Sequence, residues 1–230
     1  MNLYLVRHGL ARSNLEDPAS CPPEAEFAPY ETENSSLTPQ GVMQAALTGE
    51  RLSGVRFDAA FSSPLHRALR TAAEILSRQE KQISLEILPD LIECGTRPYL
   101  QMPGGLLRRI WPLVWPLPAP GEEGIPVDPG VAEEDPAAAA DRADRVAAEI
   151  LGRFRGEENV LVVSHGGFLH RYLCQAFLGI PRELRSRYWL SAENACITKF
   201  HFLPDGVINL VAVDETGHLG EMRSREPFDL

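Results

Sequence analysis

The chain has 230 residues, with 32 Asp and Glu against 22 Lys and Arg, which gives a formal net charge of −10 at pH 7. This length is typical of a single domain built around one core. A hydrophobic content of 44% excludes a wholly disordered chain. The acidic balance excludes nucleic acid and an anionic membrane as main partners, because binding to phosphate-rich surfaces requires a basic footprint. Any anion site must therefore be local.

Neither a targeting segment nor a membrane span is predicted. The apolar run at residues 1–6 stops at Arg7, before it is long enough for a signal peptide. The uncharged apolar stretch at 110–121 carries four prolines and is too short to cross a bilayer. The cysteines lie far apart and without the spacing of a zinc site, which predicts reduced thiols in a cytoplasmic protein that holds no metal: Cys21, Cys94, Cys174 and Cys196.

Short apolar runs alternate with stretches of helical periodicity, the pattern of successive β–α–β units. The runs predict strands at residues 3–6, 58–61, 83–88 and 159–163. The periodic stretches predict helices at residues 39–52, 64–76, 136–154 and 166–178. Thr38 before Pro39 is typical of an N-cap followed by proline at the first helical position, so the first helix is expected to begin there.

The run at 159–163 is apolar without alternation, which is typical of a central strand covered on both faces. Residues 195–202 and 207–213 are joined through Pro204, Asp205 and Gly206 and predict an antiparallel hairpin. The predicted fold class is therefore α/β. We expect a three-layer α/β/α sandwich whose sheet is mostly parallel with an antiparallel edge.

Two segments interrupt this regularity and are interpreted as insertions in a single domain over residues 1–230. Residues 15–36 hold six acidic side chains and no Lys or Arg. Residues 98–136 hold nine prolines and two of the three tryptophans. The second segment is predicted to cover a pocket as a lid or side wall. A packing arm or a homodimer contact is the alternative, because exposed aromatic patches often mark partner surfaces.

Three loops are expected at the carboxyl edge of the sheet, where helix N-termini present unpaired N–H groups to anions. They occupy residues 7–9, 62–67 and 164–167. Together they would bring two arginines and two histidines to one place: Arg7, Arg67, His8 and His165. Such a cationic pocket inside an acidic protein is suited to a phosphoryl group.

Five short motifs lie along the chain in order: Leu5-Val6-Arg7-His8-Gly9 with Asn14, Leu37-Thr38-Pro39-Gln40-Gly41, Ser62-Ser63-Pro64 with Arg67, Leu91-Ile92-Glu93, and Ser164-His165-Gly166-Gly167. In this order they resemble the histidine phosphatase superfamily, whose founding members are the cofactor-dependent phosphoglycerate mutases. The resemblance spans nearly the whole chain. It implies a phosphoglycerate mutase-like fold and a small phosphorylated substrate, with no cofactor and no metal.

The resemblance also implies roles for the matching residues at the phosphate. His8, as a neutral imidazole, attacks phosphorus and forms a phosphohistidine. Arg7, Arg67 and His165 bind the equatorial oxygens, and Asn14 adds a neutral donor, so that charge is stabilised without magnesium. His165 is thereby part of both the catalytic and the phosphate-binding set.

Glu93 is implied as the proton donor that protonates the leaving oxygen and later activates water. The sequence around it departs from the family pattern, since Cys94 begins a stretch that replaces a Gly-x-x-Glu-like element. Leu10 and Ala11 stand where the family has Glu or Gln followed by Ser or Thr. The Phe-x-Gly-Trp-x-Asp stretch of the mutases is absent, and residues 15–36 replace it with a longer loop.

The acidic residues of this loop would repel the second anionic group of a mutase's bisphosphorylated intermediate. Hydrolysis of a small phosphate monoester is therefore favoured. A mutase-type phosphotransferase is one alternative, and a phosphoprotein phosphatase or regulatory binding module is another. The remaining histidines match no motif and are interpreted as structural or surface groups: His66, His170, His201 and His218.

Overall fold

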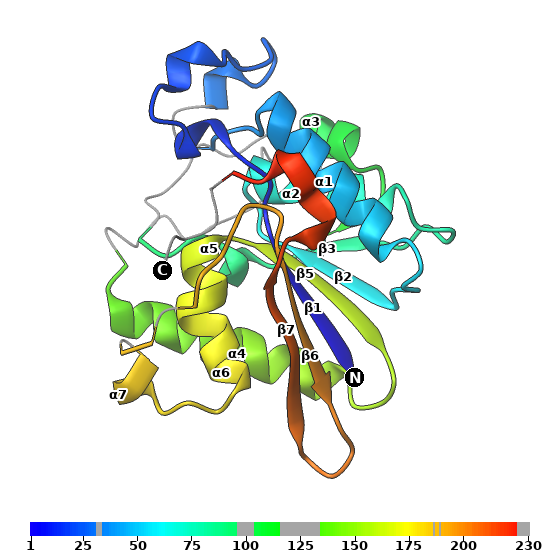
Figure 1. The fold of residues 1–230 in the computed structure, drawn as a ribbon, viewed down its shortest axis with the longest axis vertical. Coiled ribbons are helices and arrows are strands. Elements are labelled where there is room, and N and C mark those ends of the chain that lie inside the picture. The colour runs from blue at the N-terminus through cyan, green and yellow to red at the C-terminus, as the bar shows by residue number, and fades with distance from the viewer. Residues whose placement is uncertain (31–33, 96–103, 116–133, 186, 189, 225–230) are drawn as a thin grey trace.

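The computed structural model describes residues 1–30, 34–95, 104–115, 134–185, 187–188 and 190–224. Within them seven strands form one sheet, in the order β4-β3-β2-β5-β1-β6-β7 (Figure 1). The strands are β1 Asn2–Arg7, β2 Ala59–Ser62, β3 Leu85–Ile87, β4 Val114–Trp115, β5 Asn159–Ser164, β6 Ile197–Phe202 and β7 Ile208–Glu215. Each of the predicted strands is therefore present.

The sheet is parallel from β4 to β1, and β6 and β7 add an antiparallel edge. The uninterrupted apolar strand β5 lies at its centre and pairs in parallel with both β1 and β2. Both faces of β5 are buried, which is why its side chains show no polar alternation. These pairings confirm the predicted α/β class with its mostly parallel sheet and antiparallel edge.

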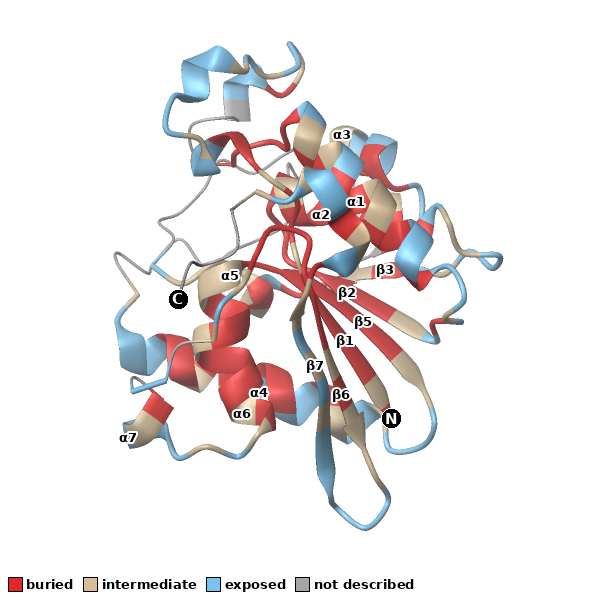
Figure 2. Ribbon diagram, viewed as in Figure 1, coloured by how far each residue is buried: buried red, intermediate tan, exposed pale blue. Residues whose placement is uncertain are grey.

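Helices cover both faces of the sheet (Figures 1 and 2). One face packs against α1 Pro39–Leu52, α2 His66–Leu76 and α3 Gly104–Ile110, and the other against α4 Pro136–Arg153, α5 Gly166–Phe168 and α6 Cys174–Phe177. Side chains alternate between the two cores along each strand: Tyr4 and Val6 of β1 enter the first core, and Leu3 and Leu5 the second. A short helix, α7 Arg182–Arg185, follows α6.

Local sequence signals account for where the long helices begin. The Thr38 hydroxyl accepts a hydrogen bond from the Gly41 N–H at 3.0 Å, so α1 begins at Pro39 as predicted. The Asp135 carboxylate likewise accepts from the Ala138 N–H at 2.7 Å and caps α4. The predicted helix after β5 is present as α5, a π-helical turn over Leu169–Leu173, and α6.

The two insertions are described in part. Residues 15–30 form short 3₁₀ turns, and the buried Arg12 guanidinium fastens them by donating to the backbone carbonyls of Pro18 and Cys21. In the second insertion Leu107 and Ile110 of α3, together with Trp111, are buried against the core of the α1–α2 face. The rest of the predicted lid, 98–103 and 116–133, lies outside the described residues, so that role stays a prediction. Across the described residues no helix combines the length and apolar character needed to cross a membrane.

Candidate active site

The two predicted histidines meet at the carboxyl edge of the sheet. Strands β1 and β5 are parallel neighbours with Arg7 opposite Ser164, so the residues that follow, His8 and His165, leave the sheet side by side. Their ring centroids are 5.1 Å apart and their planes are inclined by 62°. The His8 N–H donates to the Ser164 carbonyl at 3.0 Å, which fixes the two loops together.

His8 is held in the tautomer that a nucleophile needs. Its side chain is buried, and Nδ1 lies 2.7 Å from the Gly9 carbonyl oxygen. Because a carbonyl can only accept, Nδ1 carries the proton and Nε2 keeps its lone pair. Burial lowers the pKa of His8 well below its usual value of 6.5, and the charges of Arg67 and Arg7 lower it further. The imidazole is therefore neutral at physiological pH.

The turn that carries His8 depends on a close backbone approach. A Cβ on Gly9 would lie 2.3 Å from the Gly41 carbonyl oxygen, so only glycine fits against the first turn of α1. The Gly9 N–H donates to the Thr71 hydroxyl at 3.0 Å, and that hydroxyl donates to the Arg67 carbonyl at 2.8 Å. Thr71 thus ties the His8 loop to the helix that bears Arg67.

Both predicted arginines adjoin the histidines. Arg67, in the first turn of α2, donates from Nε to His8 Nε2 at 3.3 Å. Arg7 ends β1 and donates to the Ala192 carbonyl. A Cβ on Gly166 would lie 3.0 Å from the Arg7 Nε, so glycine at the start of α5 leaves room for that guanidinium. Two guanidinium groups thereby lie near the histidines, where their positive charge would stabilise a phosphoryl group.

His165 is fully buried and is oriented by a hydroxyl from the loop after β2. Its Nε2 lies 2.8 Å from Ser63 Oγ, just after β2. Its Nδ1 has no hydrogen-bond partner among the described residues. Burial lowers the pKa of His165 well below 6.5, and the charges of Arg67 and Arg7 lower it further. If Ser63 donates to Nε2, Nδ1 keeps the ring proton and can donate to a phosphate oxygen.

Glu93 is anchored at the first turn of the helix that follows His165. Its Oε1 accepts hydrogen bonds from the backbone N–H of Phe168 at 2.8 Å and from that of Cys94 at 2.9 Å. Its Oε2 accepts a hydrogen bond from the backbone N–H of Gly167 at 3.2 Å. The N-terminal end of a helix favours a carboxylate at this place. The Cys94 thiol also donates to Oε1 at 3.3 Å, and burial followed by the Glu93 charge raises its pKa to about 12.

Asn14 belongs to the same site through a second asparagine that the sequence did not single out. Asn14 Oδ1 accepts from the Ala11 N–H at 3.1 Å and from Asn194 Nδ2 at 3.3 Å. The same Asn194 amide donates to the His8 carbonyl at 3.2 Å. No sequence signal pointed to Asn194, whereas Ser63 and Thr71 stood inside or beside a motif without an assigned role.

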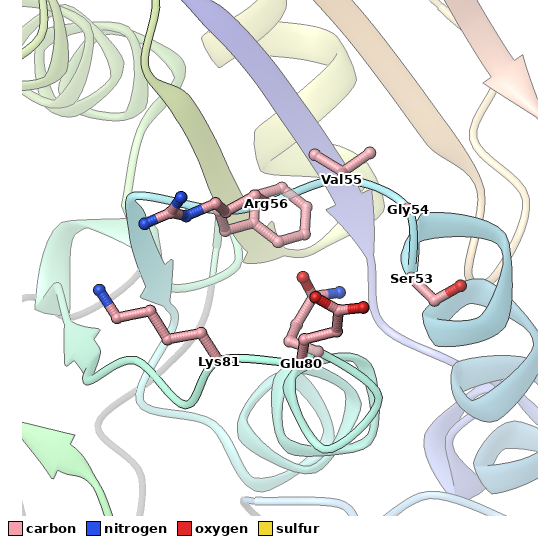
Figure 3. Close-up of a pocket in the computed structure, with 8 residues that line it drawn as sticks. Ser53, Gly54, Val55, Arg56, Glu80 and Lys81 are labelled. Carbon is pink, nitrogen blue, oxygen red and sulfur yellow. The ribbon is translucent and has the colours of Figure 1, made fainter.

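The described residues have two further features. No three His, Cys, Asp or Glu side chains are grouped there as a metal site requires. A cavity of about 440 Å³ lies at the opposite, amino end of β2 and β3 (Figure 3). It is lined by residues 53–57 and 79–81, so it is separate from the histidines.

Residues 3–215 match the histidine phosphatase superfamily (branch 1). The chain belongs to this family. It is 30% identical over 190 residues to the adenosylcobalamin/alpha-ribazole phosphatase of Escherichia coli (strain K12), covering 80% of this chain and 82% of that protein. It is also 30% identical over 201 residues to a 2,3-bisphosphoglycerate-dependent phosphoglycerate mutase of Methylobacterium sp. (strain 4-46). This match covers 79% of this chain and 82% of that protein.

Among solved structures, phosphoserine phosphatase from Entamoeba histolytica in complex with 3-phosphoglyceric acid is similar, with a TM-score of 0.58 and 22% identity over 95% of this chain and 98% of that one. This likeness shows the fold. Together the comparisons confirm the predicted family, the phosphoglycerate mutase-like fold and the predicted class of enzyme, a phosphoric monoester hydrolase.

Proposed function

We propose that this histidine phosphatase superfamily member hydrolyses a small phosphate monoester through a phosphohistidine on His8, without a metal ion. The orientation of His8 carries the proposal. With Nδ1 bound to the Gly9 carbonyl and Nε2 beside the Arg67 guanidinium, the lone pair lies where a bound phosphoryl group would be stabilised by positive charge.

The reaction proceeds in two displacements. In the first, His8 Nε2 forms a bond to phosphorus while the bond to the ester oxygen breaks, and the Glu93 carboxylic acid gives its proton to the leaving alcohol. In the second, the Glu93 carboxylate takes a proton from water, whose oxygen attacks phosphorus and releases His8 and inorganic phosphate. Arg7, Arg67 and His165 hold the equatorial oxygens throughout, as positioned charges do in other phosphoryl transfers.

The charge around the site supports hydrolysis over phosphate transfer to a second anion. The loop that begins after Asn14 is acidic in its described part and includes Glu16, Asp17 and Glu24. A phosphatase relative at 30% identity agrees with this preference. We place the activity in the cytoplasm in a single domain over residues 1–230, and the free thiols of the four cysteines support that compartment. The homodimer stays a prediction.

A phosphate-release screen tests the proposal. Sugar phosphates, phosphoglycerates, nucleotides and phosphopeptides are incubated with the wild-type protein and with His8→Ala between about pH 5 and 8. We expect release from at least one monoester class by the wild type, none by His8→Ala, and acid-labile phosphate trapped on the wild-type chain alone. Turnover that persists in His8→Ala would refute the mechanism.

Phosphoglycerate mutase activity is the second candidate, because a mutase is also 30% identical to the chain. The test is incubation with 3-phosphoglycerate, with and without the bisphosphate activator. Isomer formation that outpaces phosphate release would identify a mutase, and phosphate release that outpaces isomer formation would identify a phosphatase.

A further inference from the structure

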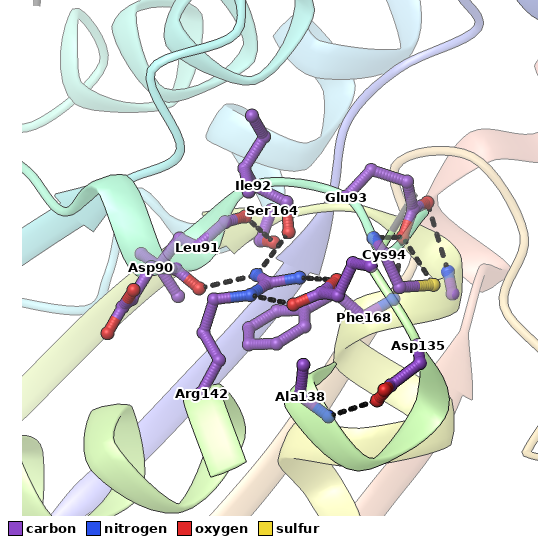
Figure 4. A network of polar contacts seen from close by, with 12 residues as sticks. Asp90, Leu91, Ile92, Glu93, Cys94, Asp135, Ala138, Arg142, Ser164 and Phe168 are labelled. Carbon is purple, nitrogen blue, oxygen red and sulfur yellow. Dashed lines mark hydrogen bonds and ion pairs between the residues drawn. The ribbon is translucent and has the colours of Figure 1, made fainter. Parts of the chain in front are cut away.

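Arg142 of α4 is a buried cation whose hydrogen bonds are directed at the segment leading to Glu93 (Figure 4). Its side chain is only 7% exposed. Nε and Nη2 donate to the two carboxylate oxygens of Glu134 at 2.7 and 2.5 Å. Nη1 donates to the carbonyl oxygens of Asp90 and Ile92 at 2.7 and 2.6 Å. The planar guanidinium therefore binds a carboxylate on one side and the backbone just before Glu93 on the other.

The same guanidinium lies over the ring of Phe168, a residue whose backbone N–H binds the Glu93 carboxylate. Its central carbon is 4.1 Å from the centroid of the Phe168 ring. The Phe168 N–H is the donor that holds Glu93 Oε1 at 2.8 Å. One side chain thus touches both the backbone that carries Glu93 and the residue whose N–H binds the Glu93 carboxylate.

The segment before Glu93 is held by side chains at three successive carbonyls. Arg142 binds those of Asp90 and Ile92, and the Ser164 hydroxyl donates to that of Leu91, between them, at 2.6 Å. Ser164 directly precedes His165, so the Glu93 segment is connected to the histidine loop as well as to α4. These contacts leave the segment little freedom to shift relative to the phosphate site.

The charge of Arg142 also acts on Cys94 and His165. It lowers the pKa of the Cys94 thiol, against the stronger effects of burial and Glu93, and it contributes to the lowered pKa of His165. The Arg142–Glu134 ion pair does not by itself imply a gain in folding stability, because well-packed apolar residues often replace buried ion pairs without loss of stability. The directed contacts to the Glu93 segment give Arg142 a more specific role.

We infer that Arg142, held in its orientation by Glu134, is a positioning residue that places Glu93 for proton transfer to the leaving oxygen. This inference rests on the proposed phosphatase function and assigns the placement of the proton donor Glu93 to a side chain of α4. Its consequence is selective: loss of Arg142 impairs the step that needs the acid and leaves phosphate binding by the arginines and histidines in place.

The experiment compares an alkyl phosphate, whose poor leaving group needs a proton, with p-nitrophenyl phosphate, whose good leaving group does not. Arg142→Met should lower kcat on the alkyl phosphate by on the order of tenfold or more, because small misplacements of catalytic groups have effects of this size. KM and the rate on p-nitrophenyl phosphate should change much less. The matched control is Arg145→Met, on the same helix, which removes an exposed ion pair to the Asp90 carboxylate and should leave the substrate ratio unchanged.

A double variant separates positioning from general destabilisation. In a Glu93→Gln background, Arg142→Met should cause no further selective loss of rate on the alkyl phosphate, because the group it positions is already gone. Equal losses on both esters in the single variant would overturn the inference. So would an additional selective loss on the alkyl phosphate in the double variant as large as that in the single variant. Arg142→Lys decides the matter if Arg142→Met does not fold: lysine lacks the bidentate fork, so a selective loss supports the inference and a uniform loss or none refutes it. Absence of wild-type turnover on every ester would instead contradict the proposed function itself.

Discussion

His170 should make the stability of the protein fall as the pH is lowered below 6.5. His170 belongs to the π-helical turn Leu169–Leu173, and its buried ring has Nε2 2.9 Å from Thr198 Oγ1. Burial is the largest cause of a pKa lowered from 6.5 to about 4. At pH 5 the imidazole is about 97% protonated in the unfolded chain and about 9% protonated in the folded protein, by simple titration from those values.

The unfolded chain therefore binds more protons below pH 6.5, and stability is lost as the pH falls from 6.5 toward 4. Integrated from pH 8 to pH 5, the contribution of His170 is a loss of about 2 kcal/mol, or roughly 4–8 °C in Tm for a chain of this size. His8 and His165 act in the same direction, since burial lowers the pKa of each. A comparison with a variant is needed to isolate His170.

The variant is His170→Gln, whose amide can still hydrogen-bond to the Thr198 hydroxyl but does not titrate. Denaturant unfolding of both proteins at pH 8 and pH 5 gives the two stability differences. We expect the wild type to lose about 2 kcal/mol more than the variant between these pH values, because the contributions of the other histidines are shared. Parallel pH dependence in the two proteins would show that His170 is not held neutral by burial.

Three further outcomes are expected. Gly167→Ala places a Cβ 2.8 Å from Glu93 Oε1, whereas ordinary contacts begin at 3.4 Å, so the Glu93 carboxylate must move. This movement should lower kcat on alkyl phosphates by on the order of tenfold. Gly152→Ala is the control, because open space surrounds Gly152 and the rate should stay unchanged. Ser63→Ala removes the partner of His165 Nε2 and should lower kcat/KM by about tenfold, measured on p-nitrophenyl phosphate; an unchanged value would exclude an orienting role. EDTA should not alter the rate, since Arg7, Arg67 and His165 supply the charge; a rate recovered only with a divalent metal would contradict this.

The order of strands and helices could be predicted because each signal is local. The N-cap at Thr38 fixes the first residue of α1, and the apolar run of β5 identifies a central strand without knowledge of its neighbours. Boundaries that depend on pairing were less accurate: β2 was predicted at 58–61 and lies at Ala59–Ser62. The short elements α3 and β4 were missed, since so few residues carry no periodic signal.

The sequence by itself was sufficient to predict that several chemistry-bearing side chains would meet at one edge of the sheet. Parallel strands bring the loops at their carboxyl ends to one edge, so motifs after β1, β2 and β5 were sufficient to name His8, Arg67 and His165. How those groups are oriented was decided only by the tertiary structure. Ser63 contacts His165 across a separation of 102 residues, and Arg142 reaches the Ile92 carbonyl across 50. Such contacts depend on how strands and helices pack, and neither residue carries a local pattern that reveals its partner.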